Sequence, residues 1–145
     1  MSNGIKVKKR NGRGIEALNL EKMHVMVEQA CEGLAGVSAS QVEINSGIQF
    51  YDGITTAEIQ EILIRSASDL IDLDHPNYQF VAARLLLFSL RKQLFGRIYD
   101  TPKVHDHVKK CVGEGIYDED ILNLYSDEEF EKLESFIDHE RDFLF

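Results

Sequence analysis

The spacing of apolar residues along this 145-residue chain changes near residue 19, and the change separates a predicted hairpin from predicted helices. From Ile5 to Lys8 apolar and basic residues alternate, and Asn11-Gly12 then supplies a dipeptide that tolerates positive φ. This pattern is typical of a β-hairpin, which we expect over residues 5–18. Because two strands alone are not stable in water, the hairpin must lie against other elements.

Beyond residue 19 the apolar residues recur at spacings of three and four, which is the pattern of amphipathic helices. Asn19 is the expected N-cap of the first helix. Ser38 with Gln41, and Thr55 with Glu58, have the form of capping boxes that open the second and third helices.

A fourth helix is expected from Pro76 to Gly96, with Leu90 among its inward-facing residues. The composition changes after Gly96, and shorter helices are expected there, one after Pro102 and a last one that Ser126 caps. We therefore expect a mostly α (α+β) fold, in which a four-helix bundle is capped by a small β-hairpin and followed by a helical extension. The expected domains cover residues 1–95 and 96–145.

Charge is distributed unevenly along the chain. The first 22 residues carry six Lys and Arg side chains against two carboxylates, although the formal net charge of the whole chain is −9. Residues 118–142 carry eleven acidic side chains against two basic ones. An acidic tail and a pI near 5.0 argue against general binding to nucleic acid or to an anionic membrane. A focused cationic site for a small anion, such as a nucleotide phosphate, agrees with this distribution.

Several classes of protein are not favoured. No run approaches the ~18 apolar residues of a membrane span, and the polar N-terminus has no signal-peptide core, so we expect a cytoplasmic chain. Cys31 and Cys111 are too few for a disulfide framework and are expected to be reduced. His105 and His107 would point to different faces of a helix, so no metal site is expected there.

A nucleotide triphosphate needs several cations and hydrogen-bond donors that converge. The candidates are Lys9, Arg10, Lys22, Thr56 and Lys92. An adenine base needs an acceptor such as Glu16 and a group that both donates and accepts, such as Asn19. The residues alone leave open the alternative that the lysines only keep a solvated hairpin edge from aggregating.

Four motifs can be compared with known families: Val7-x-Lys9-Arg10-x-Gly12, Glu16-x-x-Asn19-Leu20-x-Lys22, Gln49-Phe50-Tyr51-Asp52-Gly53-Ile54-x-Thr56-x-x-Ile59, and Tyr78-Gln79-x-x-Ala82-Ala83-Arg84-Leu85 with Leu90-Arg91-Lys92. Together they closely resemble the ATP-cone of class I ribonucleotide reductase large subunits. Later residues, including Asp106-His107-Val108, are similar to the stretch between that cone and the catalytic barrel, so the resemblance covers nearly the whole chain.

The resemblance implies a helical cone roofed by a small β element, in which bound ATP keeps the reductase active and bound dATP inhibits it by favouring an inhibited oligomer. Mg²⁺ is expected with the nucleotide. Matching motif positions would assign phosphate and sugar contacts to Lys9, Arg10, Lys22, Thr56 and Lys92, base contacts to Glu16 and Asn19, and apolar contacts to Val7, Leu18, Met23 and Ile59. The implied partners are the remainder of the large subunit, a radical-generating small subunit and further copies of the chain.

Two positions depart from the family pattern. Gln60, which we include among the nucleotide-binding residues, stands where many dATP-inhibited relatives carry a histidine that helps to distinguish ribose from deoxyribose. Gln29 stands where some relatives place an aromatic residue associated with a second nucleotide. The reductase reaction also needs a radical-forming cysteine and a redox cysteine pair on the family's barrel. Cys31 and Cys111 match neither, so we expect the chain to be inactive alone.

Two other functions can be compared with this one. ATP-cones also occur fused to a zinc ribbon in nucleotide-responsive repressors, but those carry paired Cys-x-x-Cys motifs that this sequence lacks. A degenerate cone that serves only as a structural or oligomerisation module would agree with Gln29 and Gln60.

Overall fold

A computed structural model describes residues 4–9, 12 and 14–143, which divide between Leu90 and Arg91 into two compact units. Helices account for 61% of the described residues, which confirms the mostly α prediction. The domain boundary that we expected after residue 95 stays a prediction.

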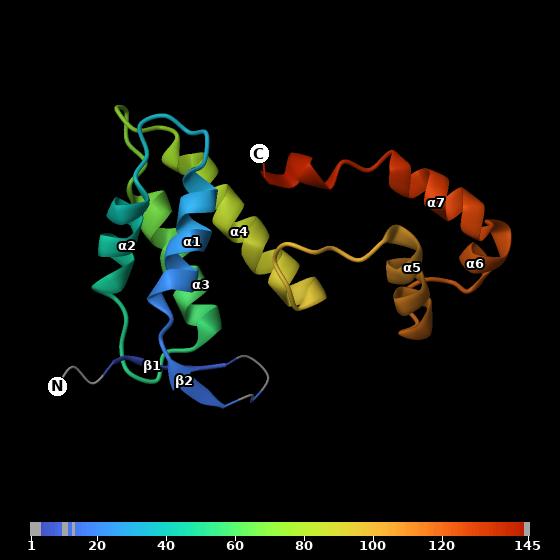
Figure 1. The fold of residues 1–145 in the computed structure, drawn as a ribbon, viewed down its shortest axis with the longest axis horizontal. Coiled ribbons are helices and arrows are strands. Elements are labelled where there is room, and N and C mark those ends of the chain that lie inside the picture. Colours follow the sequence, from blue (N-terminus) through green and yellow to red (C-terminus); the bar gives the residue numbers. More distant parts are fainter. Residues whose placement is uncertain (1–3, 10–11, 13, 144–145) are drawn as a thin grey trace. The chain divides into compact units, whose positions relative to one another are not determined.

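The first unit contains the predicted hairpin and the predicted helices (Figure 1). Its elements are β1 (Lys6–Lys8), β2 (Ile15–Ala17), α1 (Leu20–Cys31), α2 (Ala39–Gly47), α3 (Thr56–Asp69) and the part of α4 (Tyr78–Phe95) up to Leu90. The two strands are antiparallel, with Val7 opposite Glu16. The hairpin lies at the end of the unit where α1 and α3 begin.

The core of the first unit is formed by side chains from the four helices and from the residue that precedes the cap of α3. The apolar ones with no exposed surface are Val27, Ala30, Val42, Ile54, Leu63, Ala67, Val81 and Phe88. Leu90, which we expected to face inward, is 44% exposed, so that prediction is wrong. The charged Arg84 of α4 is buried. Its guanidinium donates to the carbonyls of Ala30 (3.2 Å) and Glu32 (2.7 Å), which gives hydrogen-bond partners to carbonyl groups at the end of α1.

The helix starts test the three predicted caps in this unit. The Asn19 side chain accepts the backbone N–H of Lys22, and Thr55 forms a complete capping box with Glu58, so both predictions are confirmed. The predicted box between Ser38 and Gln41 is wrong, since Ser38 begins α2 without a side-chain cap bond. The backbone N–H of Ser38, which Gln41 would have accepted, donates to the Tyr78 hydroxyl at 3.0 Å.

The second unit contains the end of α4 together with α5 (Val104–Gly113), α6 (Asp120–Leu124), α7 (Asp127–Ser135) and the short 3-10 helix η2 (His139–Phe143). The predicted capping box of Ser126 is confirmed, whereas α6 and η2 were not predicted. Helices α5 and α7 pack together, and the His105 ring stacks on Phe130 with centroids 4.5 Å apart. Glu134 of α7 accepts the Val104 N–H at 2.7 Å, and this bond is the main reason why the pKa of Glu134 is lowered.

Arg91 organises the second unit from the end of α4. It is 3% exposed, donates to the carbonyls of Ile98 and His139, and forms an ion pair with Asp142. Its guanidinium carbon also lies 4.6 Å from the centroid of the Phe143 ring. These contacts fix two later segments to one helix end.

Both cysteines are free thiols, and burial raises the pKa of Cys31 to about 11. Within the described ranges, no helix combines the length and the apolar composition that a bilayer-spanning segment requires.

Candidate functional site

Strand β1 is hydrogen-bonded along both of its edges, and these bonds fix the position of the residue that follows it. Away from β2, Lys8 N donates to Ile54 O (2.9 Å) and Lys8 forms a parallel bridge with Thr55, the cap of α3. Gly53 N donates to the carbonyl of the first strand residue (2.8 Å), and its φ of +88° is one that favours glycine. Lys9 therefore follows a residue that is bonded directly to the segment entering α3.

The two faces of the hairpin carry different residues. Val7 is 3% exposed, so its face lies against the helices, and Glu16 lies opposite it in the register. Lys9 extends the ladder through its backbone N–H and shares this inner face, because side chains alternate along a strand, whereas Lys6 and Lys8 project from the outer face. Lys9 Nζ and Glu16 Oε2 are 2.8 Å apart and form an ion pair.

The first turn of α3 has a capping box and an unbonded hydroxyl. The Glu58 carboxylate accepts from Thr55 and from the Tyr51 hydroxyl, and these bonds, with the Thr55 side chain as the largest cause, lower the pKa of Glu58. Thr56 Oγ1 is buried and has no hydrogen-bond partner among the described residues. The helix dipole favours an anion here while ionised Glu58 opposes one, so anion binding depends on added positive charge such as that of Lys9.

Gln60 lies one turn further along α3 and is 6% exposed. Its Nε2 donates to the Met26 sulfur of α1 at 3.2 Å, and its Oε1 is buried without a partner in the described part of the chain. Residues four apart share a helix face, so Thr56 and Gln60 turn two unsatisfied oxygens to the same side of α3. Each such oxygen costs ~1–3 kcal/mol unless a water or a ligand bonds to it.

The start of α1 brings further predicted residues to the same end of the unit. Asn19 Oδ1 accepts the Lys22 N–H at 2.9 Å, and the Lys22 side chain is exposed on the turn that directly follows β2. Met23 and Ile59, two predicted apolar contacts, are 9% and 8% exposed. We call the region of Lys9, Glu16, Asn19, Lys22 and Thr56 the hairpin end.

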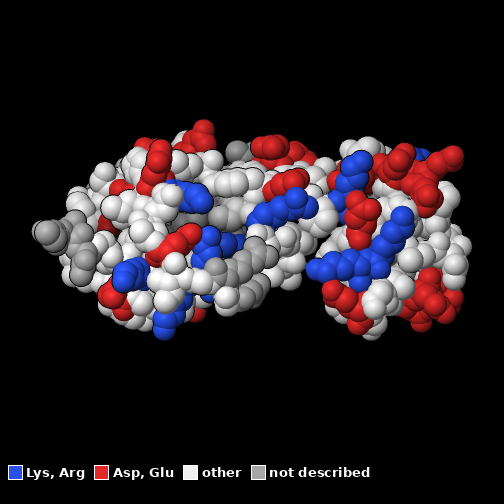
Figure 2. All heavy atoms as spheres, turned by 60° about the horizontal axis from the view of Figure 1, so that its bottom comes forward, with Lys and Arg blue, Asp and Glu red and all other residues white. Residues whose placement is uncertain are grey.

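Figure 2 turns this end of the first unit toward the viewer and shows Lys and Arg atoms there, interspersed with acidic atoms. The predicted site residue Arg10 lies outside the described residues. Lys92 lies in the last turn of α4, half-buried and within the second unit. The hairpin and the starts of α1 and α3 therefore lie at one end of the first unit, and the binding roles of their residues stay predictions, as do those of Arg10 and Lys92.

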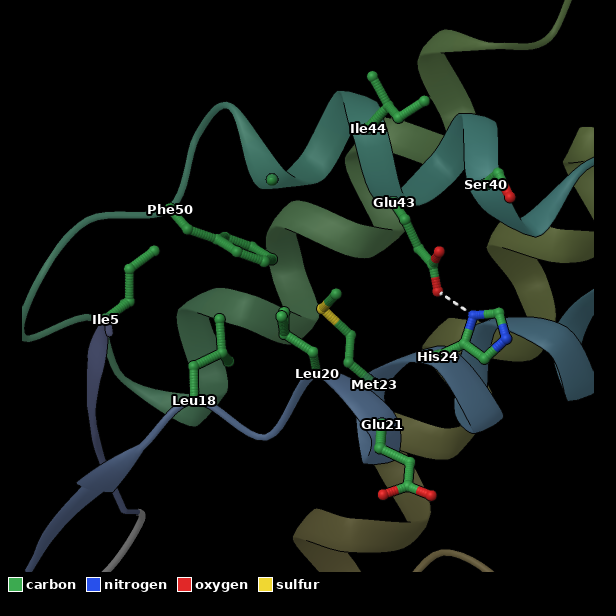
Figure 3. A pocket seen from close by; sticks show the side chains of 11 residues that line it. Ile5, Leu18, Leu20, Glu21, Met23, His24, Ser40, Glu43, Ile44 and Phe50 are labelled. Carbon is green, nitrogen blue, oxygen red and sulfur yellow. Dashed lines mark hydrogen bonds and ion pairs between the residues drawn. The ribbon is translucent and has the colours of Figure 1, made fainter. Parts of the chain in front are cut away.

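A second region of the first unit is an open pocket of about 710 Å³, which we call the α1–α2 pocket. Its lining residues are Ile5, Leu18, Leu20, Glu21, Met23, His24, Ser40, Glu43, Ile44, Gly47 and Phe50. Figure 3 shows the side chains of Ile5, Leu18, Leu20, Met23 and Phe50 converging. Of the predicted site residues that the structure describes, only the apolar Leu18 and Met23 line it.

One bonded polar pair lies among the residues that line the α1–α2 pocket. His24 Nδ1 lies 2.7 Å from the Glu43 carboxylate, and His24 Nε2 lies 3.2 Å from Glu28 (Figure 3 draws the first contact). The hydrogen bond to Glu43 is the main reason why the pKa of His24 is raised. Sequence reasoning missed this pocket because its walls come from α1, α2 and the segments that flank the hairpin and α2, and no motif joins residues so far apart.

Comparisons with known proteins identify one family and several relatives. The ATP cone domain family matches residues 5–93. Ribonucleoside-diphosphate reductase 1 subunit alpha from Escherichia coli (strain K12) is 48% identical over 145 residues, which are 100% of this chain and 19% of that protein. Subunit alpha from Buchnera aphidicola subsp. Acyrthosiphon pisum is 50% identical over the same shares. Subunit alpha from Enterobacteria phage T4 is 45% identical over 112 residues, 76% of this chain and 15% of that protein.

The family match places this chain among the ATP-cone domains, a class of domain that binds nucleotides. The chain belongs to the ATP cone domain family, and the predicted resemblance is confirmed. It spans about a fifth of the length of the curated relatives named first.

Proposed function

We propose that the first unit binds an adenine nucleotide, ATP or dATP with Mg²⁺, and that the binding controls the overall activity of a ribonucleoside-diphosphate reductase large subunit. The observation that carries the proposal is the hairpin end itself. There β1 is hydrogen-bonded to the segment that enters α3, and Lys9 directly follows the bonded strand residue. The first turn of α3 contains Thr56, whose Oγ1 lacks a partner among the described residues. A triphosphate would supply acceptors for both groups.

The proposed contacts divide by chemistry. Lys9, Lys22 and Thr56, with Arg10 and Lys92, bind the phosphates and the sugar. Glu16 accepts a hydrogen bond from the exocyclic amine of adenine, and Asn19 pairs with the ring beside it. Val7, Leu18, Met23 and Ile59 pack on the base, and Gln60 lies near the sugar. Three of these four apolar residues are less than a tenth exposed, which supports a dry wall behind the base.

The regulatory part of the proposal rests on the relatives. They are alpha subunits about five times longer than this chain, so a nucleotide bound here would act on a larger protein. The proposed partners are the remainder of such a large subunit, a radical-generating small subunit and further copies of the chain.

A degenerate cone that serves only as a structural or oligomerisation module is the second candidate. Two site residues are already engaged with neighbours, Lys9 with Glu16 and Gln60 with Met26, as they would be in a cone that no longer binds nucleotide. Light scattering separates the two functions, because a degenerate module self-associates equally with and without dATP.

Titration calorimetry of the full chain with ATP and dATP tests nucleotide binding. Lys22→Met should weaken binding roughly 10- to 150-fold, the effect of losing a hydrogen bond to a charged group of ~1.5–3 kcal/mol. Lys109→Met, on the exposed surface of α5 in the second unit, removes the same charge and should leave affinity nearly unchanged. Absence of heat at millimolar nucleotide, or equal losses in the two variants, would contradict the proposal.

A further inference from the structure

Lys9 and Glu16 are assigned to opposite ends of the proposed ligand, yet they contact each other. Lys9 Nζ lies 2.8 Å from Glu16 Oε2, and the two side chains are 40% and 49% exposed. In the proposed function Lys9 binds a phosphate and Glu16 binds the amine of adenine, and in a nucleotide the sugar lies between these two groups. Binding of one nucleotide in the proposed manner must therefore open this ion pair.

The hairpin geometry explains why these two residues meet. The backbone N–H of Lys9 donates to Gly14 O at 3.0 Å, so the position facing Lys9 across the hairpin has no side chain. Glu16, opposite Val7, is the next residue on the same face and is the diagonal neighbour of Lys9. Diagonal neighbours lie ~7–8 Å apart at Cα, a distance that a lysine and a glutamate span easily. The pair is thus set by the register of the strands.

We propose, on the basis of the proposed function, that Glu16 is an internal counter-ion of Lys9 and makes polyphosphate binding conditional on a base in the same ligand. A polyphosphate without a base must separate Lys9 from Glu16 and then leaves the carboxylate unpaired beside new negative charge. A nucleotide gives Glu16 a hydrogen-bond donor as it takes Lys9. Glu16 is therefore a specificity-determining residue that discriminates against anions lacking a base.

The exposure of the pair sets the size of the effect. Exposed ion pairs contribute little, so opening this one should weaken polyphosphate binding only about two- to fivefold. Repulsion between the released carboxylate and the anion adds to this penalty, and salt screens it. The discrimination is therefore a change in the ratio of two affinities at low ionic strength.

The test measures the Kd of ATP and the Kd of tripolyphosphate, each with Mg²⁺, for the full wild-type chain and for the Glu16→Gln variant. Glutamine keeps an acceptor oxygen for the base and removes the charge that holds Lys9. The ratio of the tripolyphosphate Kd to the ATP Kd should fall about two- to fivefold in Glu16→Gln. Glu61→Gln, an exposed carboxylate on α3, makes the same change in net charge and should leave the ratio unaltered.

A double-mutant cycle adds a readout that general charge effects do not move. In Lys9→Gln, the further change Glu16→Gln should improve tripolyphosphate binding less than it does in the wild type, because no ion pair has to be opened and only the repulsion by the carboxylate is removed. The inference is overturned if tripolyphosphate gains no affinity in Glu16→Gln, or gains it equally in Glu61→Gln or in the Lys9→Gln background. Failure of the wild-type chain to bind ATP would overturn the proposed function and this inference with it, whereas an unchanged ratio with intact ATP binding would overturn the inference alone.

Discussion

The hairpin end and the α1–α2 pocket lie in one unit and differ in whether their polar groups have hydrogen-bond partners. At the hairpin end Thr56 Oγ1 is unsatisfied, and Gln60 on the same face of α3 adds a second buried oxygen without a partner among the described residues. In the α1–α2 pocket the polar pair of His24 and Glu43 is bonded, and most of the walls are apolar. Unsatisfied buried groups lower stability, so the first region is suited to a ligand and the second to packing. Nucleotide affinity should depend on the hairpin end and, among the residues that line the pocket, only on Leu18 and Met23.

The largest effect that separates the regions should come from Thr56→Val. The change keeps the shape of the side chain and removes a hydroxyl that we propose binds a phosphate oxygen. ATP affinity should fall roughly 10-fold or more, since hydrogen bonds to charged groups contribute ~1.5–3 kcal/mol. Calorimetry gives the affinity, and thermal unfolding should show that the protein is no less stable.

Ile44→Gln is the matched variant in the α1–α2 pocket, where Ile44 is 59% exposed on α2. Its ATP affinity should stay within about twofold of the wild type, as expected of a surface change away from the ligand. Comparable losses in Thr56→Val and Ile44→Gln would mean that the two regions form one site, and the contrast drawn between them would be lost.

Gln60→Met should give a smaller effect with opposite signs on stability and binding. Methionine fills a similar volume, loses only the bond to the Met26 sulfur and removes the buried Oε1 that has no partner within the described ranges. The free energy of unfolding should rise by ~1 kcal/mol, and ATP affinity should fall. Denaturant unfolding and calorimetry measure the two quantities.

Gln41→Met provides the control, because Gln41 is an exposed glutamine of α2. Its effect on the free energy of unfolding should stay within ~0.5 kcal/mol. If Gln60→Met proves less stable than Gln41→Met, the Gln60 side chain is held by contacts that outweigh its unsatisfied oxygen, and it is a packing residue.

The contrast between the regions also explains what could be predicted from the sequence. The caps at Asn19 and Thr55 depend on residues three positions apart, and both were predicted correctly. The cap at Ser38 was predicted wrongly, because the Ser38 N–H donates to the hydroxyl of Tyr78, forty residues away. Local hydrogen bonds follow from spacing, whereas a competing tertiary partner does not.

The same distinction applies to burial and to the sites. Leu90 follows the apolar pattern of α4 but is exposed, while Arg91 beside it is buried by carbonyls and a carboxylate from residues 98–142. Family motifs mark the residues of the hairpin end in order along the chain, so the sequence could name them, and their role in binding stays a prediction. The α1–α2 pocket could not be predicted, since most of its wall residues are ordinary apolar residues and only the packing of α1 against α2 brings its walls together.

The smallest expected effect tests the polar pair of the α1–α2 pocket by pH. Glu43 raises the pKa of His24 above its ordinary value of 6.5, so protonated His24 stabilises the folded state. That stabilisation is fully present below the unfolded pKa and is lost as pH rises through the folded pKa. The difference in Tm between the wild type and Glu43→Gln should therefore shrink as pH rises from about 5.5 to about 9. Glu28→Gln should show the same trend more weakly, because Glu28 contributes less to the pKa of His24. If the Tm difference is independent of pH, the pair does not stabilise the fold through charge, and if ATP affinity follows the same pH curve, the pocket is coupled to the hairpin end.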